Sequence, residues 1–260
     1  MLTSLQIGKN GRLGNQMFQY AALVGTAFVR GYDWKLQDSD EVDLRKVFKM
    51  KNAKILDPSE TSSLEFRYEE PFFNYSPGIF TVDDNTDLFG YFQSPMYFSD
   101  SFEYLMEDYQ FLDHIRAAAN KKMSILHQGK PICSLHVRRG DYLTKQDYHP
   151  PCSVEYYKNA MQMVRNATNN NVTFLCFGDD LQWIEENLKD SDCTIVSGNT
   201  PEIDLCLMSM CNIHIIANSS FSWWGAMLGS FRNVIAPAQW FGPSGPKQWN
   251  TIYVNGWNII

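Results

Sequence analysis

The chain has 260 residues, of which 44% are hydrophobic and 20% are charged, and its formal net charge is −7. This composition is that of a folded globular protein and excludes a disordered one. The negative charge excludes a protein that coats nucleic acid, because phosphate backbones are bound mainly by clustered Lys and Arg. The length fits one large domain or two small ones packed across a cleft.

The sequence predicts neither a membrane span nor an export signal. No run of about 18 apolar residues occurs, and the first four residues lead directly into an apolar segment rather than into a basic region. We therefore expect a cytoplasmic protein. Six cysteines occur without a C-x-x-C pair, and four lie in apolar runs, which predicts reduced thiols rather than metal ligands.

The first 31 residues predict a strand, a glycine loop and a helix. Residues 2–7 are rich in apolar side chains, residues 8–14 break that segment, and apolar residues then recur at helical spacing as far as Gly31, which is suited to end a helix. A flexible loop is thus expected at a helix N-terminus, where unpaired N–H groups and the helix dipole favour anions.

The middle of the chain differs in character. Residues 57–113 are rich in aromatic and acidic side chains and show little periodicity, which indicates a loop-rich domain packed by its rings, with a sugar-stacking face as the alternative. A polar stretch over residues 120–131 is the candidate boundary. We therefore predict an N-terminal acceptor-side domain over residues 1–125 and a C-terminal donor-side domain over residues 126–260, the two roles resting on the resemblance described below.

Strand-like and helix-like segments alternate after residue 131. Strands are expected over residues 132–137, 172–177, 194–196, 213–217 and 234–236, and helices over residues 154–164 and 181–188, after the cap Thr200 and after Ser220. This alternation predicts an α/β fold whose parallel sheet is covered by helices on both faces. Such sheets bind ligands beyond the carboxyl ends of their strands, so we expect three polar loops to converge, namely residues 136–142, 178–180 and 218–221.

Two adjacent arginines, Arg138 and Arg139, directly follow the strand expected over residues 132–137. A guanidinium pairs bidentately with phosphate oxygens and stays charged, which suits a diphosphate leaving group. The alternative is an ion pair with Asp141 that holds the turn. The dipeptide alone supports the two interpretations equally.

Two other loops carry polar groups with more than one interpretation. Asn218, Ser219 and Ser220 precede an apolar helix, where they either bind phosphate or simply cap the helix. Asp179 and Asp180 leave a strand end, where a carboxylate accepts hydrogen bonds from a base edge, acts as a general base or caps the next helix. No third acid stands at a familiar ligand spacing, so no metal site is predicted.

Four segments, in the same order, resemble the alpha-1,2-fucosyltransferases of glycosyltransferase family 11. They are residues 11–21 (GRLGNQMFQYA), 90–94 (GYFQS), 136–142 (HVRRGDY) and 218–226 (NSSFSWWGA). The resemblance implies a GT-B-like architecture with two Rossmann-type halves facing a cleft. It also implies an inverting, metal-independent transfer of L-fucose from GDP-fucose to a hydroxyl, expected to be the 2-OH of a terminal beta-galactoside.

The resemblance further implies residue roles. Arg138 would hold the diphosphate and assist the departure of GDP, Ser219, Ser220 and Phe221 would meet the phosphates, and His136 and Asp179 would help to bind guanine. The resemblance does not identify a general base: Asp141, Asp179 and Glu202 are candidates, and late loss of the proton to phosphate or solvent is the alternative. The expected catalytic residues are Arg138 and Asp141. The expected donor-binding residues are His136, Arg138, Arg139, Asp179, Asn218, Ser219, Ser220 and Phe221 from the C-terminal half, with Arg12, Gly14 and Asn15 approaching from the N-terminal half.

The expected partners are GDP-fucose, as a co-substrate rather than a cofactor, and a galactose-terminated oligosaccharide or glycolipid acceptor, with no nucleic acid; peripheral contact with a membrane is compatible with this. The family often has Ser where this chain has Gly178. Two alternatives stay open: a fucosyltransferase of another linkage or with a protein acceptor, and a non-catalytic nucleotide-sugar or glycan-binding protein of the same fold. Trp223, Trp224 and Gly225 favour the alpha-1,2 enzyme.

Overall fold

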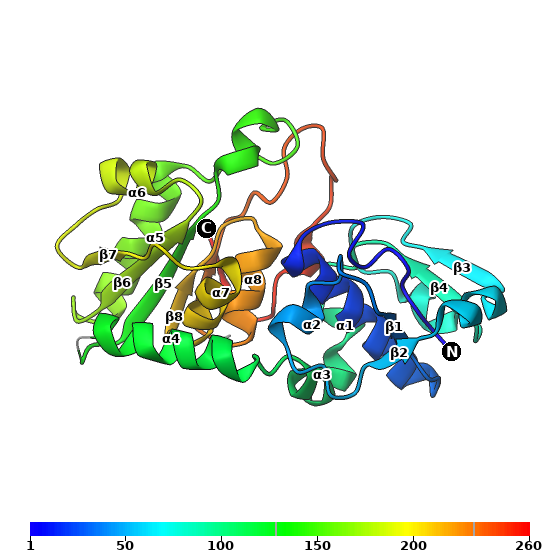
Figure 1. Cartoon of the computed structure of the whole chain (residues 1–260). Coiled ribbons are helices and arrows are strands. Elements are labelled where there is room, and N and C mark those ends of the chain that lie inside the picture. Colours follow the sequence, from blue (N-terminus) through cyan, green and yellow to red (C-terminus); the bar gives the residue numbers. More distant parts are fainter. Residues whose placement is uncertain (128, 231) are drawn as a thin grey trace. The chain divides into compact units, whose positions relative to one another are not determined.

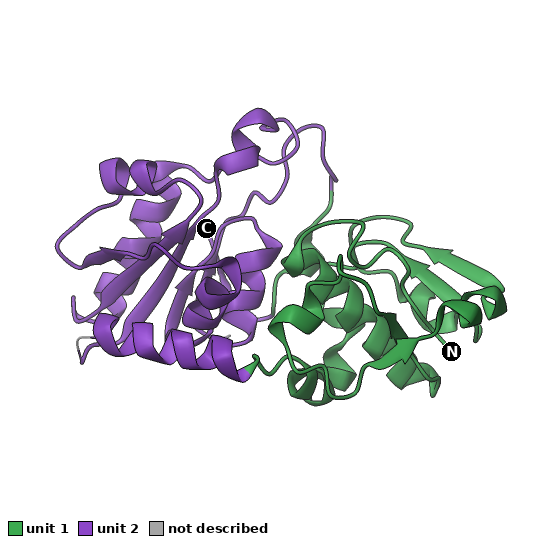
Figure 2. Ribbon diagram, viewed as in Figure 1, with its two compact units in different colours: residues 1–112, 248–254 green, residues 113–247, 255–260 purple. Residues whose placement is uncertain are grey.

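The computed structural model describes residues 1–127, 129–230 and 232–260, and the chain forms two compact units (Figure 2). Unit 1 comprises residues 1–112 and 248–254, and unit 2 comprises residues 113–247 and 255–260. The division falls after residue 112, whereas the sequence placed it after residue 125. The reason is helix α4 (Asp113–Leu126), which packs on helix α7 (Pro201–Ser209) inside unit 2.

Unit 2 is built on a six-stranded sheet with the strand order β10-β9-β8-β5-β6-β7 (Figure 1). The strands are β5 (Ile132–Val137), β6 (Thr173–Gly178), β7 (Cys193–Ile195), β8 (Ile213–Ile215), β9 (Val234–Ala236) and β10 (Asn258–Ile259). All neighbouring strands are parallel. All six residues of β5 are buried, as expected for a central strand with both faces covered.

Helices cover both faces of this sheet, which confirms the predicted α/β class. Helix α5 (Val154–Ala167) buries Tyr157, Ala160, Met161 and Val164 at helical spacing, and with α6 (Leu181–Asn187) it packs on alternate residues of β5. On the other face, α7 packs against both α4 and α8 (Ser220–Met227) (Figure 1). Thr200 caps α7 by position and Pro201 follows it, but the threonine side chain makes no capping hydrogen bond within the described chain.

Unit 1 contains two small parallel sheets that the N-terminal residues join. Strands β1 (Lys35–Gln37) and β2 (Lys54–Leu56) form one pair, and β3 (Phe66–Glu69) and β4 (Thr86–Phe89) form the other. Leu2 bridges to Trp34 and Thr3 bridges to Asp87, both in parallel. The strand predicted over residues 2–7 is limited to these two residues, because residues 4–10 turn back through hydrogen bonds such as Ile7 N–H to the Ser4 carbonyl.

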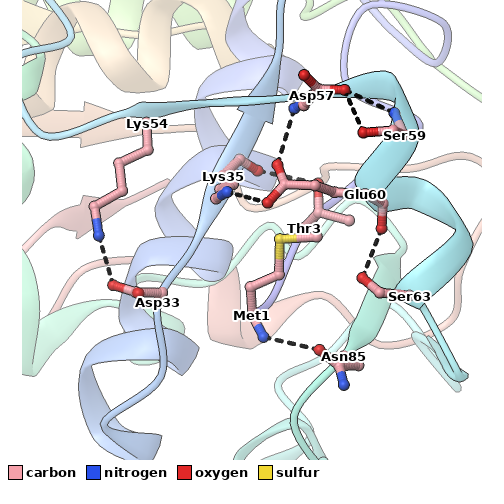
Figure 3. Close-up of polar contacts among 10 residues, drawn as sticks. All are labelled: Met1, Thr3, Asp33, Lys35, Lys54, Asp57, Ser59, Glu60, Ser63 and Asn85. Atoms are coloured by element: carbon pink, nitrogen blue, oxygen red, sulfur yellow. Dashed lines mark hydrogen bonds and ion pairs between the residues drawn. The ribbon is translucent and has the colours of Figure 1, made fainter.

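Polar contacts hold the outer strands of unit 1 (Figure 3). Lys54 donates to Asp33 over 2.7 Å, and Lys35 pairs with Glu60. Asp57 and Glu60 form a capping box at the start of the 3-10 helix Pro58–Ser63, in which Asp57 accepts from the Ser59 N–H over 2.8 Å. Local hydrogen bonds thus order the start of the segment between β2 and β4, whereas Asn74 and Tyr75 further along it bond to Asn250 and Thr251.

Helix α1 (Leu13–Arg30) is the core of unit 1, and 14 of its 18 residues are buried. Gly31 ends it in the left-handed conformation, with φ 70°, as the sequence predicts. The shorter helices of the unit are α2 (Leu44–Val47) and α3 (Phe102–Asp108). Across all described residues, none of the helices has both the length and the apolar character needed to cross a bilayer.

A close backbone contact requires the glycine in the middle of α1. A Cβ at position 25 would overlap the Tyr97 carbonyl oxygen and lie 2.9 Å from Phe98 Cα. We expect Gly25→Ala to destabilise the protein by about 3 kcal/mol, because main-chain atoms would have to move. Gly78→Ala is the control, since its nearest contacts would be ordinary ones at 3.6 Å. Urea unfolding measures both; equal stability of the two variants would contradict this packing.

Candidate functional site

The order of the six-stranded sheet creates a topological switch point between β5 and β8. Strands β6 and β7 follow on one side of β5, whereas β8, β9 and β10 lie on its other side. In open parallel sheets, ligands bind at the carboxyl ends of the strands where the order reverses. The loops that leave β5 and β8 here are two of the three polar loops that the sequence predicts to converge.

The three polar loops do lie together. Tyr142, in the loop after β5, donates its hydroxyl to the Asn218 carbonyl over 3.0 Å. The rings of His136 and Phe221 are 5.6 Å apart. Arg138 Nη1 donates to Asp179 Oδ2 over 2.6 Å, which joins the loop after β5 to the loop after β6. Side chains from three strand ends thus form one polar cluster at the carboxyl edge of the sheet.

Arg138 is fixed between two carboxylates. Its guanidinium pairs with Asp179 and with Asp141, lies 5.3 Å from the Tyr142 ring centroid and is 18% exposed. The ion pair with Asp141, which the sequence left as the alternative to phosphate binding, is therefore present. An arginine oriented in this way needs little reorganisation to meet an anion, so the ion pairs and a phosphate-binding role are compatible.

Arg139 has different surroundings from its neighbour. Its Nε donates to Asp180 Oδ2 over 3.0 Å, and its guanidinium carbon lies 4.4 Å from the Trp183 ring centroid. Asp180 also caps helix α6 by accepting from the Trp183 N–H. Arg139 therefore lies against α6, and of the two arginines it is Arg138 that shares contacts with the loop after β8, through Tyr142.

Asp179 organises the arginine turn. It accepts from the Arg139 N–H over 2.7 Å and the Gly140 N–H over 3.1 Å, in addition to Arg138. With these donors its oxygens are largely occupied, so its contacts position the turn. A Cβ at Gly178 would lie 2.7 Å from the Val137 carbonyl oxygen, so the serine expected from the resemblance would not fit this backbone without a shift.

His136 is a buried and neutral imidazole at the end of β5. It is 7% exposed, and burial lowers its pKa to about 4, with Asp179 opposing and Arg138 reinforcing that shift. Its Nδ1 is buried without a hydrogen-bond partner among the described residues. A buried polar atom of this kind is unusual in a folded protein and suits contact with a ligand.

The loop after β8 leads into the N-terminus of α8. Asn218 uses its side-chain amide inside the protein, donating to the carbonyls of Pro150 and Trp240 over 2.9 and 3.0 Å, so it orders the loop. Ser219 occupies the cap position with an extended backbone, and within the described chain its hydroxyl makes no capping bond. Main-chain N–H groups at such a helix start are suited to phosphate oxygens.

Arg12, Gly14 and Asn15 lie at the start of α1, in unit 1. Arg12 is at the cap position with an extended backbone, Gly14 is buried, and Asn15 accepts from Gln93 Nε2 over 3.0 Å. Their approach to the residues of unit 2 stays a prediction from the family resemblance.

Sequence reasoning missed two residues. Tyr142 links Arg138 to Asn218, although it stands inside a motif that the sequence singled out. Asp204 lies in the first turn of α7, in the segment that follows β7; burial raises its pKa, and Asn199 donates to it over 2.8 Å. Its signal was an acid between the apolar residues Ile203 and Leu205 of that helix. Within the described ranges, His, Cys, Asp and Glu side chains form no group of three suited to a metal ion.

A parallel sheet with this strand order and with a fixed arginine and a helix N-terminus at its switch point is typical of α/β proteins that bind nucleotides. The comparison with known families is more specific. The model of glycosyl transferase family 11 matches residues 3–260, and the chain belongs to this family.

Its relatives include bacterial and mammalian transferases. The chain is 30% identical to the alpha-1,2-colitosyltransferase of Escherichia coli, covering 89% of this chain and 90% of that protein. It is 29% identical to galactoside alpha-(1,2)-fucosyltransferase 1 of Rattus norvegicus, covering 85% and 62%.

Solved structures with a similar fold include fucosyltransferase NodZ from Bradyrhizobium (TM-score 0.56, 14% identity, 95% and 94% of the two chains) and POFUT1 in complex with GDP-fucose (TM-score 0.51, 11% identity, 90% and 95%). These similarities confirm the predicted GT-B-like fold class.

Proposed function

We propose that this chain transfers L-fucose from GDP-fucose to a hydroxyl of a glycan, with inversion, and that the acceptor is the 2-OH of a terminal beta-galactoside. One observation carries the proposal: Arg138 is held by two carboxylates at the switch point of the sheet, next to the loop that starts α8. This is where a parallel sheet of this order binds a nucleotide. The name of the rat relative supports the galactoside and the linkage.

In the proposed reaction the acceptor oxygen bonds to C1 of fucose while the bond from C1 to the β-phosphate oxygen breaks. GDP leaves with the electron pair of that bond, so negative charge grows on the β-phosphate as the sugar becomes oxocarbenium-like. Arg138 and the main-chain N–H groups at the start of α8 stabilise this charge from fixed positions. No divalent cation is needed in this scheme.

The remaining predicted residues have supporting roles in the proposal. His136 and Phe221, whose rings lie 5.6 Å apart at the end of β5 and the start of α8, contact the guanosine. Ser219 and Ser220 meet the phosphates. Asp179 and Asn218 act by positioning the two loops, since their polar atoms are already hydrogen-bonded in the protein.

The proton of the acceptor hydroxyl needs a base, and the proposal leaves its identity open. Asp141 and Asp179 are both paired with Arg138, so each already has an oxygen engaged by the guanidinium. Glu202 lies in the first turn of α7.

In the proposal Arg12, Gly14 and Asn15 approach the donor from unit 1, and the acceptor binds on that side. A cytoplasmic location fits the six cysteines, which are free thiols in the described chain.

A second donor has support from a specific finding. The relative from Escherichia coli is an alpha-1,2-colitosyltransferase, and it covers 89% of this chain. Colitose is the 3-deoxy counterpart of fucose, so the same phosphate and guanine contacts would serve either donor. What distinguishes them is whether the protein binds the 3-hydroxyl.

The test is a transfer assay with EDTA present, in which GDP-fucose and GDP-colitose are each offered with beta-galactosides, with other glycans and with a folded protein acceptor. The proposal predicts a fucosylated galactoside whose linkage NMR shows to be alpha-1,2. Faster transfer of colitose would show that GDP-colitose is the donor. Another linkage, or transfer to the protein acceptor, would show that the acceptor group differs from the one proposed. Binding of GDP-fucose without transfer to any acceptor would instead indicate a non-catalytic binding protein.

A further inference from the structure

Glu70 follows strand β3 and holds the neighbouring turn that leaves β4. Its Oε2 accepts from the Tyr91 N–H over 2.7 Å and from the Phe92 N–H over 3.0 Å, and Oε1 accepts from the Phe92 N–H over 3.1 Å. These donors lie in residues 90–94, one of the four segments shared with the family, which the mechanism above does not use. The carboxylate thus fixes the main chain of that segment.

The other side of the turn is tied to the start of α1. The Gly90 carbonyl accepts from Gln6 and from Gln19, the latter over 3.3 Å. Gln93 Nε2 donates to Asn15 Oδ1 over 3.0 Å. The turn therefore connects Glu70, at one end, with the side chain of Asn15 at the other.

These contacts hold the turn in a backbone conformation that its residues rarely adopt. Phe92 has φ 52°, in the left-handed region that bulky residues rarely occupy. A Cβ at Gly90 would lie 2.8 Å from Glu70 Oε2 and 2.9 Å from the Phe92 ring, so the glycine is needed for the carboxylate to reach the main chain. Loss of the acceptors on Glu70 would release this strain.

We propose that Glu70 is a positioning residue for the transfer reaction, whose ionised carboxylate holds the turn of residues 90–93 and, through Gln93, sets the position of Asn15. The inference rests on the proposed function, in which Asn15 approaches the donor. It concerns the geometry of the N-terminal loop and assigns Glu70 no contact with the substrate.

The charge of Glu70 depends on pH near neutrality. Burial raises the pKa of this carboxyl to about 7, against the two main-chain N–H bonds that lower it. Tyr97 is a titratable group that interacts with Glu70, and burial followed by the charge of Glu70 raises the pKa of Tyr97. On the opposite face of β3, Arg67 and Glu69 pair with each other over 3.4 Å. Above a pH of about 7 the carboxyl group is mainly ionised, and both its oxygens accept hydrogen bonds. Below that pH it is mainly protonated, and the oxygen that carries the hydrogen is a donor that repels the main-chain N–H groups.

The experiment compares wild type with Glu70→Gln across pH, with Glu69→Gln as the matched control one residue away. We expect kcat/KM of wild type to exceed that of Glu70→Gln by about tenfold near pH 8.5 and to approach it near pH 5.5, where Glu70 is also neutral. The ratio for Glu69→Gln should stay near one. A wild-type to Glu70→Gln ratio that does not change with pH would overturn the inference.

A second measurement needs no substrate. The amide resonances of Tyr91 and Phe92 should titrate with a midpoint near 7 in wild type and not in Glu70→Gln; their insensitivity to pH in wild type would also overturn the inference. A wild-type protein that transfers no sugar would contradict the proposed function, and the amide titration would show separately whether the carboxylate holds the turn.

Discussion

Replacing Arg138 by alanine is expected to lower kcat for transfer by a factor of roughly 100 to 1000, the usual effect of removing one fixed group that stabilises developing negative charge. The guanidinium is held by Asp141 and Asp179, so its loss removes a cation that is already oriented toward the carboxyl edge of β5. Arg138→Lys should recover part of the loss, because the charge returns without the planar fork. Single-turnover kinetics with GDP-fucose measure this step.

Arg165 offers a matched control. It is 17% exposed, against 18% for Arg138, and pairs with Asp190 and Asp192, but it lies near the end of α5, away from the carboxyl edge of the sheet. We expect Arg165→Ala to lower stability modestly and to leave kcat within about twofold, since its ion pairs are of the kind worth about 1 kcal/mol or less and lie away from the candidate site. Equal losses of kcat in the two variants would show that Arg138 acts through stability only.

Lowering the pH from 6.5 to about 4 is expected to destabilise unit 2 by several kcal/mol. The upper limit is the ordinary pKa of histidine, and the lower limit is the pKa of the buried His136 and His214. Burial lowers the pKa of both imidazoles, so the unfolded chain binds protons in this range that the folded chain does not. Stability therefore rises with pH across the window and is lost as pH falls. Each histidine contributes about 3 to 4 kcal/mol at most, from about 1.4 kcal/mol per pKa unit.

Replacing one of the two histidines separates its contribution to the pH dependence of stability from that of the other. His214 lies in β8, with Nδ1 2.8 Å from Ser134 Oγ and Nε2 buried without a partner among the described residues. His214→Asn should be less stable at pH 7 and should lose less stability on acidification than wild type, as measured by hydrogen exchange of β5 and β8 amides. Identical slopes for wild type and His214→Asn would contradict the buried neutral histidine.

The elements of unit 2 could be predicted from sequence because its strands are continuous apolar runs separated by helices with clear spacing. The strand expected over residues 132–137 matches β5, and the helix expected after Ser220 matches α8. Helix α4 escaped because its buried stripe consists only of Ile115, Ala119 and Met123 in a polar background. The strands of unit 1 span three or four residues, too short for an alternating pattern to show.

The sequence predicts where the candidate site lies more readily than what each of its residues does. The rule that ligands bind at carboxyl strand ends, applied to the loops after β5, β6 and β8, placed Arg138, Asp179 and Ser219 at one edge of the sheet. The sequence could not show that Asp179 accepts hydrogen bonds from main-chain N–H groups in the loop after the neighbouring strand β5, because such contacts depend on strand order. Glu70 likewise gave no signal, since its partners lie about 20 residues away along the chain.

A crystal structure of the protein with GDP tests the nucleotide site most directly. We predict that the pyrophosphate contacts the Arg138 guanidinium and the main-chain N–H groups at the start of α8, with the guanine beside His136 and Phe221. GDP bound elsewhere, with Arg138 still paired only to Asp141 and Asp179, would contradict the proposed mechanism, which depends on contact between Arg138 and the pyrophosphate.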